Sequence, residues 1–516
     1  MTSTALTKPG FAVVRRLAPF ALFAVWLAVV VWFVLDHTYW RDEVRAMAFA
    51  TSGRNVVEMW RTMHGDSHPM LWYLLLRGGH ALVGKVALPA IALLIGVAAT
   101  GLLLWRGPFS LAEKAVLLFT KFMVFEYVVM ARNYGISMLL MYAFAALYRR
   151  WRLRGPGLGI ILFLLANTNA HSAMLAGALM WFWMYDVGRE FGIRWGAPQR
   201  TVILNGVILS LGILACALTI FPTIHDAISP PAHSVGGFLA HLVNPGLDFP
   251  DLAYHEGHVP LFVVSALLLL SLLSFSDSLG RFSAAILGFL GLFTLFYFVY
   301  GGAYRHESLL LAFFVALTWI ARTDPAAKAR PAGWLRRIGA VALALLIGMQ
   351  ALSGLHYLYV LTKMPTSRSR DFGALIDQHP ELRKAMVIAD PDFLVEPLSY
   401  YAPNPVYLPR QQKDGPLVIY TTRARLNLSL DDLLQTARDL QRDRRVPVLI
   451  LLGQDLNPDE PVTVEEAYDW TLRTTPEQVA RFQAATTLLK SFGPALTDET
   501  FSVFLVKAPA AEAPKP

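Results

Sequence analysis

Long apolar runs recur from the start of this chain to about Tyr359, and they constrain its fold more than any other feature. Most of them approach the roughly 17–25 residues that an α-helix needs to cross a bilayer. Inside lipid only helices and closed barrels satisfy the backbone polar groups, so the runs predict a polytopic α-helical membrane protein. The eleven predicted spans lie at about 18–35, 86–105, 114–130, 136–148, 158–169, 173–187, 201–222, 259–275, 283–300, 308–321 and 338–358.

The composition agrees with a membrane protein and excludes other classes. Hydrophobic residues make up 55% of the 516 and charged residues only 16%, whereas average soluble domains carry about 25% charge. A single Cys excludes a disulfide framework and a thiolate metal cluster. The net charge of +8 divides into +11 before residue 360 and −3 after it. Since most of the excess lies in arginine-rich membrane loops, no nucleic-acid partner is expected.

The basic residues predict how the chain is oriented. With the N-terminus inside, 18 Lys and Arg fall in the inner segments, and the positive-inside rule supports this placement. An odd number of spans then places the chain after residue 359 outside. We expect a multi-pass protein of the inner (plasma) membrane with a cytoplasmic N-terminus. All 13 His lie in outer segments or at their edges, which predicts that any chemistry is on the outer side.

The pattern of residues 360–507 predicts a small extracytoplasmic α/β domain. It follows the predicted transmembrane catalytic domain at 1–359. Ser429 with Asp432 has the pattern of a helix N-cap. We predict an acceptor-positioning or regulatory role for this domain, and a disordered tail at 508–516. Strand-like runs lie at Met386–Ala389, Val406–Leu408, Leu417–Tyr420, Val446–Leu452 and Phe501–Val506.

The first outer segment, 36–85, holds a dense group of polar side chains. Asp42 and Glu43 follow the first span, and a helical stretch that carries Arg45 continues to about Trp60. Paired acids beside a cation can supply a base and a phosphate-binding group in one small space. A solvated helix cap explains the same residues, and both interpretations stay open at this point.

The second half of this segment contains Asp66 and His68 directly before Pro69. Proline is favoured at the first position of a helix, so a second helix is predicted at about 69–83. This helix is too short and too polar to span the bilayer, and it is expected to lie along the membrane interface.

These motifs resemble the GT-C membrane glycosyltransferases. An Asp-Glu pair after the first span, an interfacial helix and an Asp-x-His-Pro segment that opens a second interfacial helix are similar to that family. The nearest branches are the protein O-mannosyltransferases and the lipid A aminoarabinose and galacturonosyl transferases. The resemblance covers about residues 18–320 in layout and is motif-specific over 40–75. The outer turns 131–135 and 304–306 also resemble bacterial members.

The resemblance implies an inverting glycosyltransferase that acts on the outer face of the membrane. Such an enzyme moves a hexosyl or pentosyl group from a polyprenyl-phosphate-linked donor to an acceptor hydroxyl on a lipid, glycan or protein. The step needs a base for the acceptor proton and cations for the departing phosphate. It also needs an apolar groove for the isoprenoid, so membrane lipids are expected partners as well.

The family's functional residues transfer to named positions of this chain. Asp42 matches the catalytic base, Glu43 the partner that orients it, and Arg45 a residue near the donor phosphate. Asp66 and His68 match the second acidic element, although Met70 stands where the mannosyltransferases usually have a second Pro. The outer turns supply the remaining candidates for the donor-phosphate site, which are Arg132, Arg305 and His306.

A metal site is a weaker expectation. His255, Glu256 and His258 lie close together, but the metal-hydrolase motif needs histidines four apart on a helix, and here the spacing is three. The Asp-Glu pair suits either a divalent metal ion or direct base catalysis, so the cofactor stays undecided. The surrounding segment 223–258 is expected to cover the cavity or to pack on the C-terminal domain.

Two other functions remain open from the sequence. A carrier or flippase for a lipid-linked substrate is the main alternative, although repeated halves and broken helices of the kind that transporters show are not apparent. A non-catalytic anchor for the C-terminal domain would leave the Asp-Glu and His-Pro segments without a role. Lys121 and Glu126, inside the third predicted span, are either functional or bridge helices.

Overall fold

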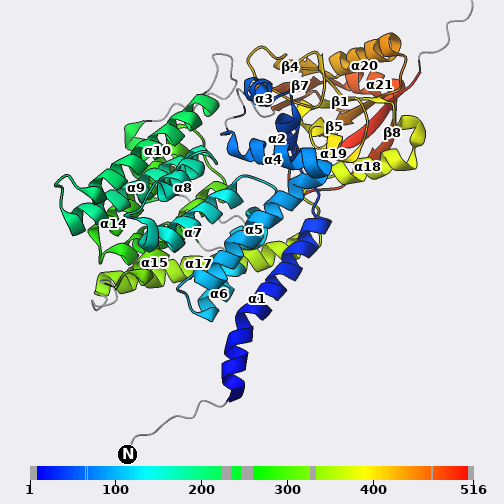
Figure 1. The fold of residues 1–516 in the computed structure, drawn as a ribbon. Coiled ribbons are helices and arrows are strands. Elements are labelled where there is room, and N and C mark those ends of the chain that lie inside the picture. Colours follow the sequence, from blue (N-terminus) through cyan, green and yellow to red (C-terminus); the bar gives the residue numbers. More distant parts are fainter. Residues whose placement is uncertain are drawn as a thin grey trace, which may run out of the picture.

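The computed structural model describes residues 9–63, 66, 68–221, 234–245, 260–325, 333–465 and 469–508. Within these residues a helical part precedes a C-terminal part that contains the β-sheets, and α1 extends away from that C-terminal part (Figure 1). The helices of the first part are α1 Pro9–Asp36, α2 Arg41–Thr51, α3 Val56–Met63, α4 Leu71–Val83, α5 Ala87–Arg106, α6 Leu111–Leu118, α7 Tyr134–Trp151, α8 Gly157–Ala166, α9 Ala170–Phe191, α10 Ala197–Ile220, α11 Val235–Val243, α13 Leu261–Ser271, α14 Leu279–Phe298, α15 Tyr304–Thr323 and α17 Trp334–Leu361.

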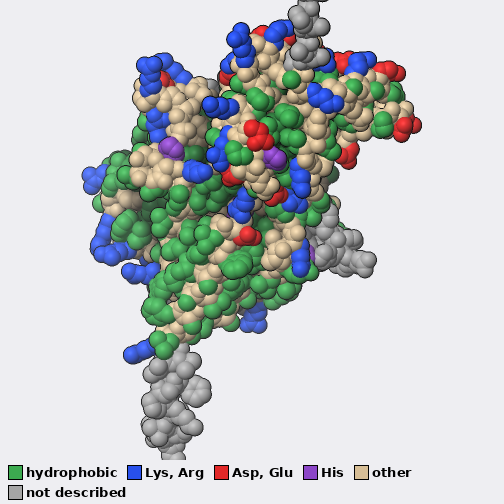
Figure 2. All heavy atoms as spheres, turned by 90° about the vertical axis from the view of Figure 1, so that its right-hand side faces the viewer, with side chains coloured by type: hydrophobic (Ala, Val, Ile, Leu, Met, Phe, Trp, Pro, Cys, Tyr) green, Lys and Arg blue, Asp and Glu red, His purple; other side chains and the backbone are tan. Residues whose placement is uncertain are grey.

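Apolar helices dominate this first part, as a multi-pass membrane protein requires. Figure 2 shows a broad hydrophobic surface over it, with charged side chains concentrated toward the C-terminal part and at the opposite end. The predicted total of eleven spans stays a prediction. Five described helical stretches are long and apolar enough to cross a membrane, namely Arg16–Asp36, Leu71–Arg106, Ala197–Ile220, Leu279–Phe298 and Trp334–Leu361.

The apolar stretch Leu71–Arg106 combines a predicted interfacial helix with a predicted span. It contains 36 residues, and a straight helix of that length would measure about 54 Å, well beyond the roughly 30 Å hydrocarbon core. The 3₁₀ turn Gly84–Val86 divides it into α4 and α5. Gly84 has a φ of 64°, a conformation that favours glycine. α4 and α5 are therefore separate helices, and the interfacial position of α4 stays a prediction.

The third predicted span, 114–130, is not one continuous helix. α6 ends at Leu118, and a π-helical segment, Phe122–Glu126, follows it. Its i→i+5 hydrogen bonding changes the side-chain spacing, and Lys121 Nζ lies 3.7 Å from the Glu126 carboxylate. The Lys121 ammonium also lies 3.9 Å from the ring centre of Tyr357 in α17. Both charges are therefore paired inside the bundle, which agrees with the bridging interpretation.

The C-terminal part is an α/β structure built around two principal sheets. One has the strand order β1-β5-β9-β8 and the other β4-β7-β6. β1 and β5 are parallel and buried at every position, as expected for strands covered on both faces. Its elements are α18 Ser369–Gln378, β1 Met386–Asp390, α19 Leu398–Tyr401, β2 Tyr407–Leu408, β3 Lys413–Asp414, β4 Asn427–Ser429, α20 Leu430–Arg444, β5 Val448–Leu452, β6 Val462–Glu465, β7 Thr471–Thr474, α21 Pro476–Ala485, β8 Thr486–Ser491 and β9 Ser502–Val506, with the 3₁₀ segments Pro380–Leu382 and Asp392–Val395.

One strand prediction in this part is wrong and one helix prediction is confirmed. Leu417–Tyr420 forms no strand, because its backbone bonds to side chains instead of a neighbouring strand. Val418 N–H donates to Glu396 at 3.1 Å, and the Val418 carbonyl accepts from Arg45. Ser429 caps α20 as predicted, since its hydroxyl accepts from the Asp432 N–H at 3.2 Å.

α2 and α4 lie between the helical part and the C-terminal part (Figure 1). They share an apolar core whose buried members include Phe49 of α2 and Trp72 of α4. Tyr400 and Tyr401 of α19 pack against the same core. The segment that carries Asp42 is thus held between the two parts of the molecule.

A buried arginine pairs with the carboxylate at the end of β1. Arg410 donates to Asp390 at 2.7 Å, and both side chains are 0% exposed. Its backbone N–H also donates to Asp392 at 3.3 Å. This ion pair ties β1 to the loop after β2.

Replacing Arg410 by Met should strongly destabilise the C-terminal part. The variant leaves the Asp390 carboxylate buried without its cation, at an expected cost of about 3–5 kcal/mol in the free energy of unfolding. The matched control is Arg444→Met, which breaks the exposed pair with Asp414 and should cost less than about 1 kcal/mol. Thermal unfolding of the purified protein in detergent compares the two. Equal shifts in the melting temperature would contradict the structural role of the buried pair.

Candidate functional site

The start of α2 places Asp42 at the centre of a charged cluster. The helix α2 follows α1 after a four-residue connection, and Asp42 is its second residue. Its Oδ2 atom lies 2.6 Å from Arg132 Nη1 and 3.2 Å from Arg305 Nη2. Arg132 precedes α7, and Arg305 is the second residue of α15. Three segments that are distant in the sequence therefore meet at one carboxylate.

The two guanidinium groups determine the protonation of this carboxylate. Burial raises the pKa of Asp42, but Arg132 and Arg305 outweigh that effect and hold the pKa well below its usual value. The Asp42 side chain remains 24% exposed, so the cluster is accessible to a ligand. Trp40 forms part of its wall, because the Arg305 guanidinium lies 5.3 Å from the centre of the Trp40 ring.

Several polar atoms of nearby side chains have unused hydrogen-bonding capacity. Buried polar groups usually have partners, so a group of orphaned atoms calls for an explanation. Two of the residues are the stacked histidines His171 and His306, whose ring centres are 4.7 Å apart. Among the described residues no partner is found for Trp40 Nε1, His171 Nδ1, Arg305 Nε and His306 Nδ1. All four atoms are buried, so each leaves a hydrogen-bonding position unfilled inside the protein.

His68 contacts the same cluster through Arg132. Its Nδ1 atom lies 2.7 Å from the Asp66 carbonyl oxygen, which can only accept, so Nδ1 carries the proton. Its Nε2 atom lies 3.3 Å from Arg132 Nη2, which can only donate. Asp42 therefore contacts one terminal nitrogen of the Arg132 guanidinium and His68 the other.

Asp66 and Arg45 form a second layer behind His68. Arg45 Nε donates to Asp66 at 2.8 Å, and Tyr73 donates its hydroxyl hydrogen to the same carboxylate. Burial raises the pKa of Asp66, but Arg45 outweighs it, and the pKa falls to about 2. Arg45 Nη1 also donates to Glu396 at 2.5 Å. Arg45 was expected near a donor phosphate, but here it already pairs with two acidic side chains, Asp66 and Glu396.

Glu396 reaches this layer from the C-terminal part. Burial raises its pKa to about 7, even though Arg45 lowers it. No sequence pattern pointed to Glu396, because its partner lies 351 positions away. Tyr134 was also missed as an individual residue, although it belongs to the turn 131–135 that the resemblance singled out.

Glu43 does not face the charged cluster. It is 0% exposed, and its Oε2 atom lies 2.8 Å from His37 Nε2 and accepts from the Trp40 N–H at 3.2 Å. Its Oε1 atom accepts from the Ala131 N–H at 2.6 Å. Glu43 therefore joins the start of α2 to the residue before Arg132, a geometry that positions both charges of the Asp42–Arg132 pair.

His306 does not contact Asp42 itself but lies next to residues of the cluster. Its Nε2 atom is 2.7 Å from the Tyr134 hydroxyl, and its neighbour Arg305 reaches Asp42. The structure thus brings Asp42, His68, Arg132 and Arg305 into direct contact. Arg45, Asp66 and His306 follow as a surrounding layer, and Glu43 supports the cluster from the opposite side.

The residues present do not fit a divalent metal ion at Asp42. Two guanidinium groups already contact the carboxylate, and their charge opposes a second cation. Within the described part of the chain, no group of three or more His, Cys, Asp or Glu could hold a metal. The predicted metal candidates His255, Glu256 and His258 lie outside the described residues.

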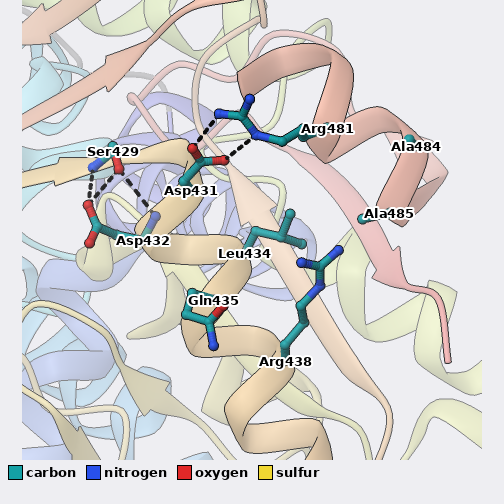
Figure 3. Close-up of a pocket in the computed structure, with 9 residues that line it drawn as sticks. All are labelled: Ser429, Asp431, Asp432, Leu434, Gln435, Arg438, Arg481, Ala484 and Ala485. Carbon is teal, nitrogen blue, oxygen red and sulfur yellow. Dashed lines mark hydrogen bonds and ion pairs between the residues drawn. The ribbon is translucent and has the colours of Figure 1, made fainter. Parts of the chain in front are cut away.

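A cavity lies far from these residues along the chain. It occupies about 660 Å³ between α20 and α21, and Figure 3 shows Arg481 paired with Asp431 at its edge. Arg438 also lines the cavity, and the Arg481–Asp431 ion pair is exposed, with 56% and 41% of the two side chains accessible. It therefore offers no chemistry comparable to the Asp42 cluster.

Glu43→Gln should destabilise the protein although it changes only one atom. Each Glu43 oxygen accepts a hydrogen bond from a backbone N–H, and the amide nitrogen of Gln cannot accept one. An unmade buried hydrogen bond costs about 1–3 kcal/mol. The thermal unfolding midpoint of the full chain should fall. Glu381→Gln is the control, since that side chain is 68% exposed. A midpoint no lower than that of the control would contradict the joining role of Glu43.

Comparisons with known proteins add one structural likeness. No family model matches the sequence, and no curated protein matches it. The solved structures that match include apo ArnT from Cupriavidus metallidurans, at 12% sequence identity and a TM-score of 0.49. The alignment covers 94% of this chain and 97% of that chain.

Proposed function

We propose that the chain is an inverting GT-C glycosyltransferase. It moves a sugar from a polyprenyl-phosphate-linked donor to an acceptor hydroxyl on the extracytoplasmic face of the membrane. The observation that carries this proposal is the meeting of Asp42, Arg132 and Arg305 at the end of the first apolar helix. The resemblance of residues 40–75 to GT-C motifs agrees with it.

The reaction assigns each member of the cluster a role. Asp42 takes the acceptor proton as the acceptor oxygen attacks the anomeric carbon. The bond between that carbon and the phosphate oxygen breaks on the opposite face, and its electron pair stays on the phosphate. A phosphodiester with one negative charge thus becomes a monoester with about two. Arg132 and Arg305 would stabilise this added charge, as guanidinium groups suit phosphate oxygens.

The low pKa of Asp42 in the free protein implies that the donor binds before Asp42 acts as a base. A carboxylate held by two guanidinium groups is a weak base. A donor phosphate that binds Arg132 and Arg305 competes with Asp42 for their hydrogen bonds. The carboxylate would then become more basic when the donor is present. Glu43, Arg45, Asp66 and His68 would act as positioning residues around this exchange.

Asp42→Asn should abolish transfer while leaving the fold intact. General base catalysis contributes roughly 10²–10⁴-fold, and Asn keeps the size of the side chain but cannot accept the proton. Transfer from a radiolabelled polyprenyl-phosphate sugar by the purified protein measures the loss. Asp36→Asn is the matched control, because Asp36 is exposed at the end of α1. Transfer by Asp42→Asn at the rate of the control would reject the base. Transbilayer movement of the donor without bond cleavage would favour a carrier.

Arg305→Gln should shift the acidic limb of the pH profile upward. Arg305 lowers the pKa of Asp42, so its removal raises that pKa and leaves more Asp42 protonated at a given acidic pH. The shift in kcat/KM, which reports the free enzyme, should be about 1–3 pH units. Arg54→Gln is the control, since Arg54 is exposed in the same outer segment. An acidic limb at the wild-type pH would contradict the coupling between Arg305 and Asp42.

A further inference from the structure

The C-terminal part provides hydrogen bonds to the backbone that leads into α2. Tyr39 N–H donates to the Tyr401 hydroxyl oxygen at 2.7 Å, and Ser369 donates to the Tyr39 carbonyl at 3.1 Å. Arg370 donates to the His37 carbonyl at 2.5 Å. Free backbone groups in a connection between helices normally bind water or nearby residues. In this connection their partners come from more than 300 positions away.

Glu499 binds the N-terminus of α2 directly. The Arg41 N–H, one of the first amides of the helix, donates to Glu499 Oε1 at 2.7 Å. The first amides of a helix have no partner within it, and the helix dipole favours a carboxylate there. The Arg41 guanidinium pairs with the adjacent Asp498 as well, with Nη2 and Oδ2 3.0 Å apart. Because Asp42 follows Arg41, this contact lies one residue from the proposed base.

Glu396 acts on the same helix one turn further along. It pairs with Arg45, and the contacts continue from Arg45 through Asp66 and His68 to Arg132. Arg132 then contacts Asp42. An unbroken series of ion pairs and hydrogen bonds therefore joins the C-terminal part to the proposed base from a second direction.

We infer that the C-terminal part positions the active site, with Glu499 and Glu396 as positioning residues for α2 and therefore for Asp42. Glu499 fixes the start of the helix, and Glu396 fixes Arg45 and the layer behind Arg132. This inference rests on the proposed function only for its catalytic consequence. The structural consequence, a start of α2 held in place by the C-terminal part, is independent of the reaction.

The experiment compares variants that keep or lose the oxygen that accepts from the start of α2. Glu499→Met removes both carboxylate oxygens at similar size, whereas Glu499→Gln keeps an oxygen that can accept from Arg41. Glu396→Met removes the partner of Arg45. Glu460→Gln is the control, because that acid is exposed in the C-terminal part. Each full-length protein is purified in detergent and studied by hydrogen exchange and by transfer kinetics.

Hydrogen exchange tests the positioning without any assumption about the reaction. Peptides from residues 37–51 should exchange roughly fivefold faster in Glu499→Met, as expected from a lost helix cap. Peptides from β1 and β5 should keep their protection and report that the C-terminal part is folded. Glu499→Gln should restore the wild-type rate over 37–51. Unchanged exchange there in both Met variants overturns the inference, as does a faster rate that Glu499→Gln fails to restore.

Transfer kinetics test the catalytic consequence. In both Met variants kcat per folded molecule should fall on the order of 10- to 100-fold, because small misplacements of a catalytic group are costly. A role limited to stability would lower the folded fraction and leave kcat per folded molecule unchanged, and that result would overturn the inference. Absence of transfer in the wild-type protein would instead reject the proposed function, while the exchange result would still decide the positioning.

Discussion

The interaction on which the site depends is the pairing of one partly buried carboxylate with two guanidinium groups. Removing such charges from water is expensive, so the pairing persists only where the backbone around it is closely held. Glu43 bonds the backbone next to Arg132, and the N-terminal turn of α15 places Arg305. Arg132 and Arg305 both face Asp42, and His68 lies beside Arg132. These surrounding contacts hold the backbone that carries Asp42, Arg132 and Arg305.

The same arginines are suited to two anionic partners in turn. In the free protein both contact Asp42, and because two guanidinium groups face one carboxylate, one positive charge remains in this partly buried region. A bound phosphodiester, with its single negative charge, would compensate that charge. Arg45 has no such freedom, because Asp66 and Glu396 hold it from both sides. The number of acidic partners thus separates these arginines. Arg132 and Arg305 share one carboxylate and can bind a ligand in its place, whereas Arg45 is held by two acidic side chains.

Local patterns in the sequence predicted what depends on local physics. Apolar runs marked the long helices, and the Ser429 cap followed from its spacing to Asp432. Asp42 and the turns with Arg132 and Arg305 were also identified, because ionisable residues stand out at the ends of apolar runs. The π-helical segment after Lys121 left no such pattern, and neither did β6 and β8, which are short and half exposed. Glu396 and Glu499 could not be found, since their importance comes entirely from partners hundreds of residues away.

The cap on α2 also bears on the order in which the protein is made. Glu499 follows every described helix of the first part, whereas the helix it caps begins at Arg41. During synthesis these helices therefore leave the ribosome before the carboxylate that completes the start of α2. The cluster around Asp42 thus depends on a segment that is made after all of them. A nascent or truncated chain could insert in the membrane with its reactive residues present and still lack their final arrangement.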